Sequence, residues 1–174
     1  EARKTLAAAP KSFTYFPGTT RVNAELAPDI FNKSYSITAQ VDNPDGKAEG
    51  VLVTQGSKFG GYGLFVQNGK PAFVYNWGDS ARYTITAAEP LPAGKSTIRF
   101  EFAWDGGKLG AGGTGTLFIN DKKAGEGRVE HTMMTGFSFD ETFDVGEDSG
   151  APAADYRIPF RFTGKLEKLT FDLK

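Results

Sequence analysis

The chain has 174 residues, enough for one domain that buries roughly 70% of its unfolded surface. It contains no cysteine, which excludes disulfides, thiolate zinc sites and a cysteine nucleophile. The net charge of −1 without a long basic run argues against nucleic-acid binding, and no apolar run approaches the roughly 20 residues that span a bilayer.

The first residues, EARKTLAAA (1–9), are the only good helix-forming stretch, and Pro10 ends it. The opening Glu1–Lys4 lacks the apolar segment of a signal peptide, and an internal fragment would look the same. We interpret residues 1–12 as a linker or the remnant of an upstream domain, and residues 13–174 as one β-sandwich domain.

Strand patterns begin at Ser34, where apolar and polar residues alternate as far as Val41. Asn43–Gly46 (NPDG) is a turn signal, and Val51–Val53 is a short strand buried on both faces. Residues 59–77 (FGGYGLFVQNGKPAFVYNW) predict a hairpin closed by an Asn-Gly turn.

The second half of the chain continues this pattern. Ile98–Trp104 shows the clearest alternation, and we expect the glycine-rich stretch 106–115 to be a flexible connection. Residues 116–119 and 122–129 predict a second hairpin whose charged return strand lies at an edge or faces solvent. In the last strand, 162–173, the apolar positions change parity, which predicts a bulge near residues 167–168.

Many short strands with no helix between them predict an all-β, antiparallel β-sandwich. The lone His131 has no catalytic partner that the sequence can assign, so a surface or turn position is the better interpretation. The glycine-rich stretch lacks the Gly-Lys-Ser/Thr ending of a phosphate-binding loop.

The densest charge follows Phe139, in the stretch DETFDVGED (140–148). The spacing of its carboxylates fits a two-carboxylate glycosidase site poorly. An irregular acidic loop can wrap a calcium ion, so the calcium candidates are Asp140, Glu141, Asp144, Glu147 and Asp148. The alternative is a solvated loop that pairs with Arg157 and Arg161.

Four aromatic residues in and after the hairpin are candidates for stacking on sugar rings: Tyr62, Tyr75, Trp77 and Tyr83. A sandwich offers a concave sheet that could display them. The alternative is ordinary core packing, because aromatic residues in strands mostly fill cores.

Several segments, in order and over most of the chain from about Phe13, resemble the C-terminal region of bacterial arylsulfatases of the long-chain type. They are NKSYSITA (32–39), EGVLVTQG (49–56), FGGYGLFV with GKPAFVYN (59–76), GGTGTLF (112–118), GEGRVEHT (125–132), FSFDETFDVGEDSG (137–150) and DYRIPFRFTGK (155–165). The resemblance implies a lectin-like or laminin-G-like (concanavalin A-like) jelly roll appended to an α/β catalytic domain.

In that family, the catalytic domain hydrolyses sulfate esters with a formylglycine, made from a C/S-x-P-x-R motif, beside a calcium ion. Only Arg157–Arg161 (RIPFR) has this spacing here, and arginine cannot be oxidised to the aldehyde. The resemblance therefore implies a non-catalytic accessory domain without a cofactor of its own, calcium aside. It favours a periplasmic or secreted parent, although the sequence leaves the compartment open.

Two roles follow. As an accessory domain, the chain would pack on the catalytic sulfatase domain and shape substrate access or oligomer contacts, through Asp144, Glu147, Asp148, Arg157 and Arg161. As a carbohydrate-binding module, it would hold sulfated or other glycans. A sulfated ligand needs clustered arginine or lysine, and Lys58, Lys70 and Arg82 near the hairpin are a thin substitute.

Overall fold

A computed structural model describes residues 9–137 and 142–174 of the chain. The helix-forming residues 1–8 and two of the calcium candidates, Asp140 and Glu141, lie outside these ranges. Among the described residues, no helix is long and apolar enough to cross a membrane.

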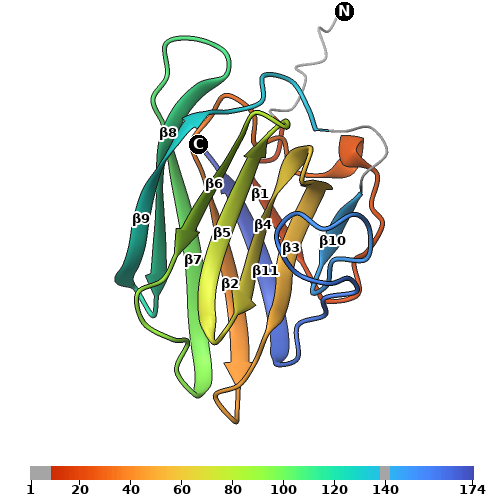
Figure 1. Cartoon of the computed structure of the whole chain (residues 1–174), viewed down its shortest axis with the longest axis vertical. Helices are drawn as coiled ribbons and strands as arrows, with labels where there is room; N and C mark the ends of the chain where they lie inside the picture. The colour runs from red at the N-terminus through yellow and green to blue at the C-terminus, as the bar shows by residue number, and fades with distance from the viewer. Residues whose placement is uncertain (1–8, 138–141) are drawn as a thin grey trace, which may run out of the picture.

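The described residues form two antiparallel sheets, which lie one behind the other in Figure 1. The six-stranded sheet has the order β1-β11-β2-β7-β8-β9, and the five-stranded sheet has the order β10-β3-β4-β5-β6. The strands are β1 (Ser12–Tyr15), β2 (Tyr35–Asn43), β3 (Gly50–Ser57), β4 (Gly60–Gln67), β5 (Lys70–Trp77), β6 (Ala81–Thr86), β7 (Gly94–Trp104), β8 (Ala111–Ile119), β9 (Lys122–His131), β10 (Phe143–Val145) and β11 (Lys165–Leu173). The predicted all-β sandwich is confirmed.

The alternating segments became the central strands of the six-stranded sheet. Strands β2 and β7 pair in register from Tyr35 opposite Phe102 to Asn43 opposite Gly94, and every second residue of β2 is buried. Strand β3 has all eight residues buried, so the doubly buried segment around Val51–Val53 is correct but longer than predicted.

The turns follow the predicted chemistry. Asn68 and Gly69 adopt φ values of +52° and +75° between β4 and β5, and Asn120 and Asp121 adopt +51° and +64° between β8 and β9. Positive φ at both central positions is the geometry of a tight hairpin turn. The bulge in β11 is also confirmed, because its register against β2 shifts between Leu166 and Lys168.

The glycine-rich stretch corrects one prediction: it is not a flexible connection, because β8 already begins at Ala111. A β-carbon on Gly113 would lie 2.4 Å from the Phe102 ring, and one on Gly115 would lie 2.7 Å from the Phe100 ring. These glycines make room for the aromatic rings of β7, so they belong to the packing of the sheet.

The main core lies between the sheets and is rich in aromatic residues. Phe73 of the five-stranded sheet stacks on Phe100 of the six-stranded sheet, with ring centroids 3.6 Å apart and planes 11° from parallel. A smaller apolar cluster covers the outer face of the five-stranded sheet, where Val51, Phe65 and Val74 contact Ala153 and Ala154. The loop after β10 therefore crosses the front of that sheet, as the blue segment in Figure 1 shows.

Candidate functional site

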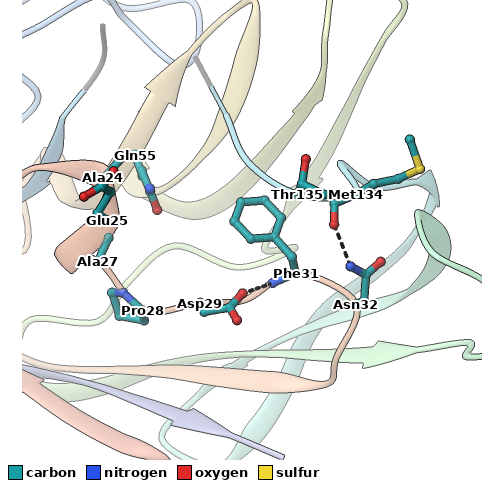
Figure 2. Close-up of a pocket in the computed structure, with 10 residues that line it drawn as sticks. All are labelled: Ala24, Glu25, Ala27, Pro28, Asp29, Phe31, Asn32, Gln55, Met134 and Thr135. Carbon is teal, nitrogen blue, oxygen red and sulfur yellow. Dashed lines mark hydrogen bonds between the residues drawn. The ribbon is translucent and has the colours of Figure 1, made fainter. Parts of the chain in front are cut away.

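A groove opens at the end of the sandwich where β3 meets β4, and we call it the end groove. Its walls are residues 23–32, the side chain of Gln55, and residues 134–137. One part of it, drawn in Figure 2, has a volume of about 350 Å³, and an adjoining part of about 300 Å³ shares Gln55 and Phe31.

The first wall is a short, tightly turned segment. Asn23 caps the 3₁₀ helix η1 (Ala24–Leu26) by accepting the backbone N–H of Glu25 at 3.1 Å. Asp29 then accepts the backbone N–H of Phe31 at 3.2 Å, as Figure 2 shows. These side-chain bonds fix the backbone of the segment, and Glu25, Asp29 and Phe31 line the groove.

Asn32 joins three loops through one side chain. Its Nδ2 donates to the carbonyl oxygen of Met134 at 2.7 Å, and its Oδ1 accepts the backbone N–H of Gly110 at 2.8 Å. Its backbone has φ of +53°, which asparagine tolerates better than most residues. The first wall is thereby bonded directly to the second wall and to the loop between β7 and β8.

The second wall is anchored to the core. The backbone N–H of Met133 donates to the hydroxyl oxygen of Tyr75 at 2.9 Å. Phe137 packs between Phe31 and the core, with ring centroids 5.0 Å from Phe31 and 5.7 Å from Tyr62. The groove therefore rests on buried aromatic residues of both β4 and β5.

Gln55 lines the groove and has a side-chain oxygen that these contacts leave unpaired. Its side chain comes from the end of β3, opposite Tyr62 of β4, and the residue is 3% exposed. Its Oε1 has no hydrogen-bond partner among the described residues. Figure 2 shows the amide directed into the groove beside Ala24 and Glu25. A buried amide oxygen without a partner costs about 1–3 kcal/mol, so this position favours a ligand that donates a hydrogen bond.

The four aromatic candidates do not share a sugar-binding face. Tyr62 and Tyr75 are 0% and 3% exposed, and their rings pack in the core, so the stacking prediction is wrong for these two. Burial raises the pKa of both phenols. Trp77 is half-buried and stacks on His131, with centroids 4.5 Å apart, and Tyr83 is half-buried against the core. The outer face of the sheet is covered near β3 and β4 and does not display these rings.

Asp144 and Asp148 hold the loop that covers the sheet. Asp144 accepts the backbone N–H of Arg21 at 2.6 Å and the hydroxyl of Ser149 at 2.9 Å. Asp148 accepts the hydroxyl of Tyr156 and the backbone N–H of Ala153. Burial raises the pKa of the Asp148 carboxyl, although these hydrogen bonds oppose the shift.

These positions limit the predicted contact with a neighbouring domain. Asp144 and Asp148 are 1% and 2% exposed, so they are unavailable to one, and that part of the prediction is wrong. Glu147 pairs with Arg161 at 2.6 Å, and Arg157 is exposed. For Glu147, Arg157 and Arg161, the contact stays a prediction.

Calcium binding also stays a prediction, because two of its five candidates lie outside the described ranges. Within those ranges, no group of three or more His, Asp or Glu side chains is placed to hold a metal.

The sequence indicated none of the groove. Phe31 belongs to no motif, and residues 23–32 have no strand pattern. Asn32 and Gln55 lie within segments that carry the resemblance, but that resemblance implies no role for either. One signal was available: Gln55 is the largest of the three polar residues, Thr54, Gln55 and Ser57, in a strand that is buried throughout. A polar side chain in such a run needs a hydrogen-bond partner, but the sequence does not show whether the fold supplies one.

The sequence matches no protein-family model and no curated protein. Solved structures do match the fold. Domains LG1–3 of the laminin alpha2 chain superpose with a TM-score of 0.60 at 15% identity, over 92% of this chain and 30% of that one. Domains LG4–5 of the mouse laminin alpha1 chain superpose with a TM-score of 0.55 at 13% identity, over 92% of this chain and 41% of that one.

Carbohydrate-binding modules match as well. The module CBM40 of the Ruminococcus gnavus IT-sialidase has a TM-score of 0.57 at 13% identity, over 82% of this chain and 78% of that one. Domain 4 of a GH43 extracellular arabinanase from Geobacillus stearothermophilus, in complex with arabinotriose, has a TM-score of 0.54 at 16% identity. The match covers 88% of this chain and 65% of that one. The fold is therefore a laminin-G-like jelly roll, as the resemblance implied, and identities this low establish the fold alone.

Proposed function

We propose that this chain is a non-catalytic carbohydrate-binding domain and that the end groove is its binding site. The observation that carries the proposal is the unpaired, buried Oε1 of Gln55 in an open groove beside the ring of Phe31. An aromatic surface can contact the C–H face of a sugar, and a few convergent polar groups then fix its hydroxyls. Similarity in fold to two carbohydrate-binding structures supports the same function.

The location of the domain is part of this proposal. The matched arabinanase is extracellular, and polysaccharides are abundant outside cells. We therefore infer that the domain works outside the cytoplasm.

A glycan array, followed by titration calorimetry of the ligands found, tests the function and its location on the molecule. Phe31→Leu keeps an apolar side chain but removes the ring, so we expect affinity to fall about tenfold, equivalent to about 1.4 kcal/mol. Trp77→Ala is the matched control, because Trp77 is a half-buried aromatic residue at the same end but outside the groove. An array without reproducible ligands contradicts the function; loss of binding in Trp77→Ala alone contradicts the site.

A second candidate function is that of an accessory domain of an arylsulfatase, which the ordered sequence segments support. Four apolar side chains at the groove end are also 58–73% exposed, as expected of a face that packs on a neighbour. They are Leu26, Phe59, Leu109 and Met134.

The natural protein that contains this domain tests that candidate. We expect it to hydrolyse an aryl sulfate, and to unfold at a lower temperature when Leu26 and Met134 are both changed to Lys. An unchanged unfolding temperature contradicts packing through this face, and the absence of a sulfatase domain from that protein contradicts the candidate altogether.

A further inference from the structure

The charges around the end groove bear on which glycans it can take. Its walls contain two ionisable side chains, Glu25 and Asp29, and no Lys or Arg among the described residues that line it. Lys33 lies next to the groove, but its Nζ pairs with Asp29 at 2.9 Å. This pair offsets the charge of Asp29, so Glu25, Asp29 and Lys33 together carry a net charge of −1. A ligand with a sulfate or carboxylate would therefore meet a net charge of its own sign, chiefly that of Glu25.

The other basic residues near the hairpin do not compensate. Lys58 and Arg82 both pair with Asp155, with N–O distances of 2.8 and 3.3 Å. Their shared partner lies in the loop over the outer face of the five-stranded sheet, and none of the three lines the end groove.

The unpaired Oε1 of Gln55 sets a second condition. It is an acceptor only, so a ligand group that reaches it must donate a hydrogen bond. Sugar hydroxyls and the N–H of an N-acetyl group meet this condition, whereas an ionised sulfate or carboxylate offers only acceptors. The ring of Phe31 beside it suits the apolar face of an uncharged sugar.

Building on the proposed function, we propose that the end groove selects uncharged glycans and rejects sulfated, uronic and sialylated ones. Gln55 accepts a hydrogen bond from a hydroxyl or N–H of the bound sugar. Glu25 accepts a further hydroxyl of the sugar. Glu25 and Asp29 together repel acidic substituents, and Lys33 offsets only one of their two charges.

Matched pairs of sugars test this selectivity on the whole domain. Xylo-oligosaccharides are compared with their glucuronic acid-substituted forms, and lactose and N-acetyllactosamine with their 3′-sialyl and 6-sulfo derivatives. We expect the uncharged member of each binding pair to bind at least about tenfold more tightly at 0.05 M salt, and the difference to shrink at 0.5 M because salt screens the repulsion.

Two variants separate the contributions of charge and hydrogen bonding. The double variant Glu25→Gln and Asp29→Asn should bring acidic derivatives to within about threefold of their uncharged partners. Gln55→Met keeps the length of the side chain but removes its acceptor. It should weaken uncharged ligands about tenfold while the domain unfolds at the same or a higher temperature, because an unpaired buried group is gone.

The outcomes distinguish this inference from the function on which it rests. Tighter binding of the acidic member overturns the inference but leaves carbohydrate binding intact. Unchanged selectivity in the double variant, or unchanged affinity in Gln55→Met, also overturns it. If no sugar of either kind binds, the proposed function itself fails.

Discussion

At Gly113 and Gly115 of β8, a hydrogen atom occupies the place where any other residue would put a β-carbon. The rings of Phe102 and Phe100 fill that space from the neighbouring strand. Gly115 is also in contact with the opposite sheet, since a β-carbon there would lie 2.6 Å from Cδ1 of Ile85. Each glycine loses backbone entropy in a strand, and closer packing of large side chains offsets this loss.

Gly115→Ala should therefore destabilise the domain by about 1–3 kcal/mol, the usual cost of overfilling a core. Gly63→Ala in β4 is the matched control, because a β-carbon there has only ordinary contacts, the nearest at 3.7 Å. We expect it to be neutral or slightly stabilising. Urea unfolding measures both variants, and equal stabilities would contradict the packing argument.

The same glycines explain why the start of β8 could not be predicted from the sequence. Alternation predicts a strand through the side chains on its two faces, and glycine has no side chain to show which face is buried. Residues 111–115 therefore read as a loop until the rings above them were placed. Where side chains alternate, as in β2 and β7, the strands were predicted closely.

The candidate site was harder to predict, for a related reason. Gln55 is a candidate because its buried Oε1 has no hydrogen-bond partner among the described residues. A missing hydrogen bond leaves no pattern in the sequence. Tyr62 and Tyr75 read as candidates for a ligand because aromatic residues serve both cores and sugars. Only the burial of their rings distinguishes these roles.

At the scale of elements, residues 131–137 decide whether the groove has a second wall. This segment leaves the end of β9 and crosses the end of the sandwich without joining a sheet beyond His131. Thr132 bonds it to the start of β8, its N–H donating to the carbonyl oxygen of Gly110 and its hydroxyl to that of Ala111. Beyond Thr132, its anchors are single hydrogen bonds to Tyr75 and Asn32, together with the buried ring of Phe137. Such a segment can open locally while the sheets stay folded.

Tyr75→Phe should loosen this segment, because it leaves the N–H of Met133 without its partner. We expect a loss of about 1–2 kcal/mol in stability and faster hydrogen exchange of the Met133 amide. Tyr62→Phe is the control from the opposite position on β4, since the Tyr62 hydroxyl has no partner among the described residues. That variant should be neutral or stabilising, and equal effects of the two would contradict the anchor.

At the scale of the whole molecule, its carboxylates respond to pH in opposite directions. Two exposed carboxyls have lowered pKa values: Asp105 accepts a hydrogen bond from Arg128, and Glu126 accepts one from Lys123. Their contribution to folding stability is therefore present at neutral pH and lost in acid. The pKa of Asp148 is raised by burial. The Asp148 carboxyl therefore stays protonated to a higher pH in the folded state than in the unfolded state. Its contribution to stability falls as the pH rises above 3.8, the ordinary pKa of an aspartate.

Asp148→Asn removes this titration, so its stability relative to the natural domain should rise as pH increases from about 4 to 7. Urea unfolding at several pH values measures the difference. Asp105→Asn is the control with the opposite sign, because its partner Arg128 favours the ionised form. A difference between Asp148→Asn and the natural domain that does not change with pH would contradict the assignment.

The two hydrogen bonds of the Asn32 side chain couple the end groove to the loop between β7 and β8. Since one amide spans the Met134 carbonyl and the Gly110 N–H, order gained by one loop is shared by the other. A sugar that reduces the motion of the groove would therefore also reduce the motion of the turn that carries Leu109. If bound sugar raises the affinity of that turn for a partner protein, the bound partner raises the affinity for the sugar by the same factor.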